Sequence, residues 1–384
     1  MAIHANNVTG SSTSTGSFGH ILKDGVNWDT AVSASAVSIG FGSGGGFDYT
    51  SGSSPVVTTN PSSLGATWIN TTSGELFIAT DISTNENIWI GTAGTEVEPN
   101  FYFGSRGLFG GGNSTSNVID YITIATTGNA TDFGNLSVGR FYVSACSNRS
   151  RGLFGGGKTS SQSNVIDYVT IGTTGNATDF GNLTVSRNGP GACSDGTKGL
   201  WGGGNTGSVS NVIDYITIAT TGNASDFGNL SVSRKLLSAC SDKTKGLFGG
   251  GDTGSTSNVI DYVTIATTGN ASDFGNLSVS RKQLAACSDG TKGVFGGGDT
   301  GSVSNVIDYV TIATTGNAID FGDLSVSRKQ LAACSDGTKG VFGGGTTGSL
   351  SNVIDYVTIA TTGNAIDFGD LSVTRKQLAS CSGT

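Results

Sequence analysis

The chain has 384 residues, 63 of them glycine and only 4 proline, so it lacks the proline that a collagen triple helix needs. Hydrophobic residues make up 35% and charged residues 12% of the chain, which argues against disorder driven by charge repulsion and favours short strands joined by tight glycine turns. The net charge of −8 lies mainly in residues 1–100, where one lysine stands against eight acidic residues. Residues 101–384 therefore have no positive excess for binding nucleic acid.

Residues 1–65 are predicted to be an extended β segment for attachment and oligomerisation. They are poor in large apolar side chains and rich in glycine, serine and threonine, as in the run at residues 9–19. Such a segment cannot bury enough surface to fold alone, so it needs a partner chain or a larger assembly. The start of the chain lacks the basic residues and apolar run of a secretory signal. No stretch approaches the roughly 20 apolar residues of a membrane span, so we expect cytoplasmic synthesis and no membrane insertion.

Residues 66–100 form a different unit, a small β-meander followed by a linker. Three apolar stretches, at residues 66–70, 75–79 and 87–90, are separated by polar turn residues. Trp68 and Trp89 lie in the first and third of these stretches. A three-stranded meander of this size is marginally stable by itself.

A repeat of 47 residues fills residues 101–384. The string Asn-Val-Ile-Asp-Tyr occurs six times at this interval, and one arginine and one cysteine recur with it. The aspartates of the string are Asp120, Asp167, Asp214, Asp261, Asp308 and Asp355. The arginines are Arg140, Arg187, Arg234, Arg281, Arg328 and Arg375, and the cysteines are Cys146, Cys193, Cys240, Cys287, Cys334 and Cys381.

Each copy predicts four short antiparallel strands. In the copy that starts at Ser280 these are residues 283–287, 292–295, 306–313 and 320–326. Asp289 and Gly290 form a tight hairpin turn, three glycines end the second strand, and β-branched residues alternate in the third. Four antiparallel strands in about 40–50 residues are the size of one propeller blade.

The order of these features resembles the kelch repeat: an arginine, a small apolar strand, an aromatic residue with a glycine run, and then Asp-Tyr. The resemblance covers residues 101–384 and implies a six-bladed β-propeller with four-stranded blades. The tryptophan of the last kelch strand is replaced by phenylalanine, at Phe133, Phe180, Phe227, Phe274, Phe321 and Phe368.

The ends of the repeat region predict how such a ring closes. The first copy begins near Gly107 without a cysteine-bearing strand, and a spare strand with Cys381 follows the last copy. We expect this C-terminal strand to pair with the first three strands, at about residues 107–138, which removes two open sheet edges.

Three segments resemble tailed-bacteriophage fibre and appendage proteins. They are the Gly-Ser-Ser-Thr-Ser-Thr-Gly-Ser-Phe-Gly run, the Trp-Ile-Asn-Thr-Thr-Ser-Gly-Glu-Leu-Phe stretch, and the Thr-Thr-Gly-Asn-Ala turn before Asp-Phe-Gly, which is similar to repeats of marine phage structural proteins. The resemblance implies a virion protein that docks on other virion proteins through residues 1–100 and carries the propeller outward. It also implies a homo-oligomer, with a trimer favoured.

The residue types and their spacing do not match a catalytic or metal site, so we expect no catalytic residues, metal or cofactor. A copper-radical site would need histidines, and the only two, His4 and His20, lie outside the repeats. Cysteines 47 residues apart lack the spacing of a zinc site and are predicted to be small buried residues. We expect either Arg–Asp contacts or Asp–backbone contacts to hold the turns in each repeat. The aspartates are those before the phenylalanines: Asp132, Asp179, Asp226, Asp273, Asp320 and Asp367.

Binding residues are predicted where the copies differ. Lysine follows the repeat arginine in four copies, whereas Phe141 and Tyr142 follow it in the first. These loops are expected to share one face with the loops after the glycine runs, where a basic arc and an aromatic pair would suit an anionic host-surface glycan. The candidates are Arg140, Phe141, Tyr142, Arg234, Lys235, Arg281, Lys282, Arg328, Lys329, Arg375 and Lys376.

Three functions remain open at this point. The first is a non-enzymatic tail fibre or virion appendage that attaches to host glycan through several weak sites. The second is a capsid decoration or stabilising virion protein whose exposed loops bind no ligand. The third is a carbohydrate-active enzyme, against which the lack of a carboxylate pair set apart from the repeat argues.

Overall fold

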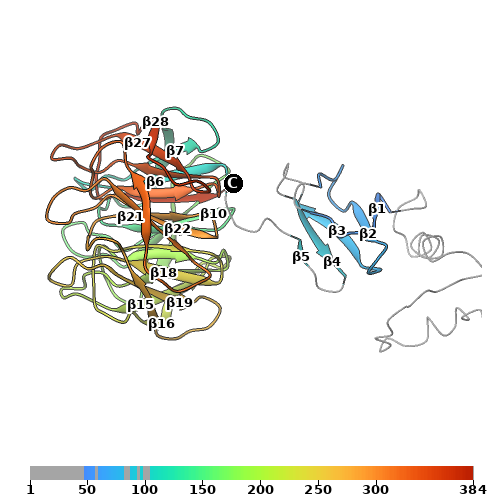
Figure 1. Ribbon diagram of the computed structural model, residues 1–384, viewed down its shortest axis with the longest axis horizontal. Helices are drawn as coiled ribbons and strands as arrows, with labels where there is room; N and C mark the ends of the chain where they lie inside the picture. Colours follow the sequence, from blue (N-terminus) through green and yellow to red (C-terminus); the bar gives the residue numbers. More distant parts are fainter. Residues whose placement is uncertain (1–46, 57–58, 82–86, 93–95, 98–103, 384) are drawn as a thin grey trace, which may run out of the picture. The chain divides into compact units, whose positions relative to one another are not determined.

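The computed structural model describes residues 47–56, 59–81, 87–92, 96–97 and 104–383. The chain divides into two units, Met1–Asn100 and Phe101–Thr384, which are considered separately (Figure 1). The described residues are all-β, without an α-helix, and they include no helix long and apolar enough to cross a membrane. The structure predicted for residues 1–46 lies outside the described part of the chain.

The first unit contains a five-stranded sheet. Its strands, in spatial and chain order, are β1 (Tyr49–Ser51), β2 (Thr67–Asn70), β3 (Leu76–Asp81), β4 (Ile88–Gly91) and β5 (Glu96–Val97). Strands β2 to β4 are the three stretches of the predicted meander, paired antiparallel. Strand β1 comes from the segment predicted to serve attachment and pairs parallel with β2. The ring of Tyr49 stacks on that of Trp68, with 5.7 Å between the ring centroids.

The second unit contains six four-stranded antiparallel sheets among its described residues. In spatial order, the first three are β29–β6–β7–β8 (Ala379–Gly383, Arg106–Gly110, Val118–Thr123, Thr131–Asn135), β9–β10–β11–β12 (Ser144–Ser147, Arg151–Gly155, Val165–Thr170, Thr178–Asn182) and β13–β14–β15–β16 (Gly191–Ser194, Lys198–Gly202, Val212–Thr217, Ser225–Asn229). The others are β17–β18–β19–β20 (Ser238–Ser241, Lys245–Gly249, Val259–Thr264, Ser272–Asn276), β21–β22–β23–β24 (Ala285–Ser288, Lys292–Gly296, Val306–Thr311, Ile319–Asp323) and β25–β26–β27–β28 (Ala332–Ser335, Lys339–Gly343, Val353–Thr358, Ile366–Asp370).

Local chemistry explains the strand ends in each sheet, as β21 and β22 show. The side chain of Asp289 accepts hydrogen bonds from the N–H groups of Thr291 and Lys292, at 2.8 and 2.6 Å, and so forms the turn between the two strands. The first strand begins at Ala285, two residues later than predicted. Gln283 cannot continue a strand because its φ is +60°.

Neighbouring sheets pack by laying an aromatic ring on a glycine at the end of the second strand. A Cβ atom on Gly296 would lie 2.6 Å from the ring of Phe342, so only glycine fits there. The same contact recurs from sheet to sheet and returns to the first repeat, where the ring of Phe109 lies on Gly343. The glycine–ring pairs are Gly110–Phe154, Gly155–Trp201, Gly202–Phe248, Gly249–Phe295, Gly296–Phe342 and Gly343–Phe109.

The predicted pairing of the C-terminal strand with the first repeat is confirmed. Strand β29 runs antiparallel to β6, with Cys381 opposite Leu108 and Gly383 opposite Arg106. The strand therefore supplies the cysteine-bearing edge that the first copy lacks.

Candidate functional site

Each connection between two sheets contributes one residue to a closed cycle of backbone hydrogen bonds, which we call the turn ring. Its members are 47 residues apart: Tyr142, Gly189, Leu236, Gln283, Gln330 and Gln377. Each backbone N–H donates to the carbonyl of the member before it, at 2.7–2.9 Å, and the cycle closes from the N–H of Tyr142 to the carbonyl of Gln377. The backbone N–H and carbonyl groups of the turn ring therefore bond to one another. Only the side chains of these residues are available to contact a ligand.

Backbone conformation sets the turn ring apart from ordinary loops. All six residues have φ between 54° and 63°, a region that costs non-glycine residues about 1 kcal/mol or more. Five of the six are not glycine, so the hydrogen-bonded cycle holds them in this conformation. Such backbone strain is concentrated at functional sites in proteins.

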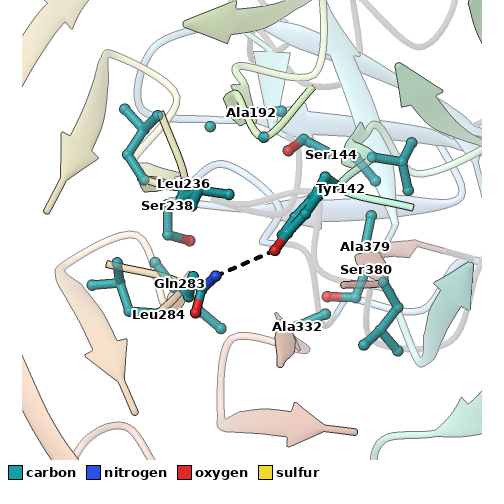
Figure 2. Close-up of a pocket in the computed structure, with 18 of the residues that line it drawn as sticks. Tyr142, Ser144, Ala192, Leu236, Ser238, Gln283, Leu284, Ala332, Ala379 and Ser380 are labelled. Carbon is teal, nitrogen blue, oxygen red and sulfur yellow. Dashed lines mark hydrogen bonds between the residues drawn. The ribbon is translucent and has the colours of Figure 1, made fainter. Parts of the chain in front are cut away.

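The turn ring surrounds a cavity of about 100 Å³, the ring cavity. Its wall continues onto the first strands of the sheets, with Ser144, Ser238 and Ser380 among several alanines (Figure 2). Among the described residues that line it, none carries a charge. A second cavity of about 110 Å³ is lined by the Cys-Ser pairs of the same strands and lies further along them. The two cavities share Ala145, Ala239, Ala286, Ala333 and Ser380.

Tyr142 breaks the symmetry of the ring cavity. Its side chain points across the space toward Gln283, as Figure 2 shows, and its hydroxyl oxygen accepts hydrogen bonds from Nε2 of Gln283 at 3.3 Å and of Gln330 at 2.8 Å. Burial raises the pKa of Tyr142 above its usual value, against the opposing effect of hydrogen bonds from Gln377, Gln330 and Gln283. The phenol therefore stays neutral and keeps its proton at physiological pH.

Two amide oxygens and one hydroxyl at this cavity lack a hydrogen-bond partner although they are buried. They are Oε1 of Gln283, Oε1 of Gln330 and Oγ of Ser380. Reversing the amides would orphan the nitrogens instead, so either orientation leaves one polar atom of each amide unpaired. An unsatisfied buried polar atom costs about 1–3 kcal/mol. These atoms have almost no solvent-accessible surface, so they face other protein atoms and not the open space of the cavity.

The predicted lysines lie beside the turn ring, on the same face as the loops that follow the glycine runs. Nζ of Lys282 lies 3.1 Å from Oδ2 of Asp252, and Nζ of Lys329 lies 2.8 Å from Oδ2 of Asp299. Burial raises the pKa of each carboxyl, but the backbone N–H that each accepts and the neighbouring lysine hold it below its usual value. Two of the four predicted lysines are therefore neutralised by carboxylates.

The other predicted loop residues are part of the same rim. The backbone of Lys235 exchanges hydrogen bonds with that of Asp252, at 3.1 and 2.7 Å, and the N–H of Lys376 donates to the side chain of Asn113 at 2.9 Å. Phe141 lies next to Tyr142 with 5.6 Å between ring centroids. The side chains of Lys235, Lys376 and Phe141 are half-buried.

The five arginines predicted to bind ligand are not on the surface, which corrects that part of the site. Each has a relative exposure of 2% or less, so its guanidinium is out of a glycan's reach: Arg140, Arg234, Arg281, Arg328 and Arg375. Each pairs at 2.6–2.8 Å with the aspartate of an Asn-Val-Ile-Asp-Tyr string, not with the aspartate before phenylalanine. The string is the next one along the chain for four of them and the first one for Arg375. Burial lowers the pKa of these guanidiniums more than the paired carboxylates raise it. Their role is structural.

The cysteines are buried and unbridged, as predicted, and they also pack against a neighbouring sheet. Burial raises the pKa of the Cys381 thiol to about 12. A Cβ atom on Gly152 of the next sheet would lie 2.9 Å from its Sγ. Within the described residues, no group of three or more His, Cys, Asp or Glu side chains is placed to hold a metal ion.

Sequence reasoning missed the glutamines and Ser380. The sequence does contain a signal for the glutamines, two positions after each repeat arginine. There the six copies carry Tyr, Gly, Leu, Gln, Gln and Gln, although the sequence around this position repeats closely. No protein-family model matches the chain, and no curated protein matches it either.

Proposed function

We propose that the chain is a non-enzymatic virion appendage protein whose repeat unit binds a host-surface glycan. The proposal rests mainly on the positions at which the six copies of the repeat differ from one another. The sheets repeat their contacts from copy to copy, whereas the turn ring and the lysines beside it differ between copies, and the turn ring surrounds a cavity lined by uncharged residues. A ligand that binds once per molecule needs a surface of this kind.

The architecture that presents this site is, in our proposal, a closed six-bladed β-propeller of kelch-like repeats. Three sets of contacts support closure because each passes through all six sheets and returns to the first. They are the hydrogen bonds of the turn ring, the aromatic rings on glycines, and the cysteines that face a glycine of the following sheet. Pairing of β29 with β6 joins the two ends of the repeat region in one sheet.

The virion assignment rests on the resemblance of the N-terminal run, the Trp-Ile-Asn stretch and the repeat turn to phage appendage proteins. In this proposal residues 1–100 dock on other virion proteins, the chain forms a homotrimer, and three propellers on one appendage add their affinities. Gold-labelled antibody against this chain should mark appendages of the virus that encodes it. Labelling of the capsid shell alone would favour a decoration protein.

A second candidate, a stabilising virion component without ligand, is favoured by one observation. Tyr142 crosses the ring cavity and is held there by two glutamines, an arrangement that could serve only to hold the ring together. This candidate predicts that changes at the turn ring alter stability and nothing else.

A glycan array probed with the full chain separates the two candidates. We expect the full chain to retain a restricted set of glycans, and Lys235→Ala to reduce this retention. Lys243→Ala is the control: it removes the same charge from the turn at the other end of β17 and should not change retention. Retention of no glycan, by the full chain and by intact particles alike, would contradict attachment and leave the stabilising role.

A further inference from the structure

One position of the repeat decides whether a lysine beside the turn ring is neutralised. It is the first residue after each glycine run, and in two copies it is an aspartate 30 residues before the lysine. Lys282 pairs with Asp252 at 3.1 Å, and Lys329 pairs with Asp299 at 2.8 Å. These four side chains together therefore have no net charge to present to a ligand.

The remaining lysines of the rim lack such an aspartate. Asn205 stands 30 residues before Lys235, and Thr346 stands 30 residues before Lys376. In the second copy the position itself carries a cation, Lys158. Within the described part of the chain no ion pair involves these three lysines, and their side chains are only half-buried, so solvent reaches them.

The three unpaired lysines lie on one continuous part of the rim, which we call the positive arc. Its members are Lys158, Lys235 and Lys376. The backbone of Phe141 exchanges hydrogen bonds with that of Lys158, at 3.1 and 2.8 Å, and the N–H of Tyr142 donates to the carbonyl of Gln377 at 2.9 Å. The connections that carry Lys376 and Phe141 are therefore neighbours. The connection that carries Lys235 lies two further around the turn ring, and the paired lysines occupy the rest of it.

The charge of the positive arc is available to a ligand. Burial raises the pKa of the Asp252 carboxyl, and the N–H of Gly254, Lys282 and, most weakly, Lys235 lower it. Lys282 therefore balances this carboxylate, and Lys235 is left with its charge. Ammonium groups at separate points along the arc attract a chain with several acidic groups more strongly than a single acidic sugar. Phe141, which lies between them, provides an apolar surface for the C–H groups of a sugar ring.

We propose that the positive arc binds an acidic glycan that carries at least two carboxylate or sulfate groups, with Lys158, Lys376 and Phe141 at the centre of the contact. This inference rests on the proposed attachment to glycan, and it adds the chemical class of the glycan and the part of the rim that binds it.

The repeat itself supplies substitutions that neutralise the arc without removing a lysine. Asn205→Asp and Thr346→Asp each introduce the aspartate that other copies carry, 30 residues before Lys235 and Lys376. The turn accepts either residue, because the side chains of Asn205, Thr346 and Asp252 each accept a hydrogen bond from the N–H two residues later, at 3.0–3.2 Å. We expect each new aspartate to pair with its lysine as Asp252 and Asp299 do.

The test measures retention of the full chain on an array of sialylated, sulfated and uronic-acid glycans and their neutral parents. We expect retention of acidic glycans and not of the neutral parents, with a decrease as the salt concentration rises. Asn205→Asp, Thr346→Asp and Lys158→Asn should each weaken the retention by about threefold to tenfold. Thr291→Asp is the matched control: it adds the same charge to the exposed turn between β21 and β22 and should not change retention.

Thermal unfolding separates lost binding from lost structure. Each new ion pair lies at a half-buried position, so the unfolding midpoint of the two aspartate variants should stay the same or rise. Full retention of acidic glycans by Asn205→Asp/Thr346→Asp, or retention of neutral glycans alone, would overturn the inference and leave attachment itself intact. Retention of no glycan by the unmodified chain would contradict the attachment on which the inference rests.

Discussion

Replacing one buried arginine tests what holds the repeats together. Arg281 donates from Nη2 to Asp308 at 2.8 Å and to the carbonyl of Phe295 at 3.0 Å, and from Nη1 to the carbonyl of Val306 at 2.6 Å. It follows β20 in the chain and binds groups on β22 and β23, so it links two sheets. In Arg281→Met, Asp308 keeps only its hydrogen bonds from Ser278, at 2.6 and 3.2 Å.

The magnitude follows from the charge left behind. Removing one partner of a buried ion pair costs about 3–5 kcal/mol, mostly because the remaining charge is uncompensated. The double variant Arg281→Met/Asp308→Asn removes that charge and should recover about 2 kcal/mol relative to Arg281→Met. Guanidinium unfolding followed by circular dichroism measures both, and hydrogen exchange shows whether the link between β20 and β21 opens first.

A control and a refuting result complete this experiment. Lys158→Met removes a cation from a half-exposed position and should change the free energy of unfolding by no more than about 0.5 kcal/mol. The structural role of the arginines would be refuted if Arg281→Met cost less than about 1 kcal/mol, or if the double variant were no more stable than the single one.

Three further predictions concern acid, thiols and the last strand. The pKa values of Asp252 and Asp299 lie below the usual 3.8, so the folded state favours their ionised forms. The resulting stabilisation is present above about pH 4 and is lost as the pH falls through the pKa values of the folded state. Asp252→Asn/Asp299→Asn should flatten the fall in unfolding free energy between about pH 5 and pH 2, and an unchanged slope would contradict the ion pairs. The six thiols should react with Ellman's reagent only in denaturant, because burial raises their pKa; rapid reaction of the native chain would show that they are accessible. Deleting residues 376–384 removes β29, leaves β6 as an open edge and should broaden the thermal transition, so an unchanged melting curve would contradict closure.

Regular features of the sequence predicted the sheets well. A six-fold repeat with alternating apolar residues specifies strands that are stable only when neighbours pack on them, so the period, the strand order and the pairing of the C-terminal strand could all be inferred. The arginines were placed wrongly because a charged side chain in a polar loop usually lies in water. The signal against this was their constant spacing of 27 residues from a repeated aspartate, as in Arg140 and Asp167.

The ring cavity could not be inferred in the same way. Gln283, Gln330 and Tyr142 are 47 and 141 residues apart along the chain, and they meet only because six connections converge on one hydrogen-bonded cycle. Their positive φ values also have no sequence signature, since tyrosine, leucine and glutamine all avoid that conformation. Side-chain convergence of this kind depends on how the sheets pack.

A crystal structure of the full chain with the glycan that the array retains tests the central claim most directly. We predict density for the glycan on the face that carries the turn ring and the lysines beside it. Density on the turns at the opposite ends of the strands, with none on this face, would contradict the account.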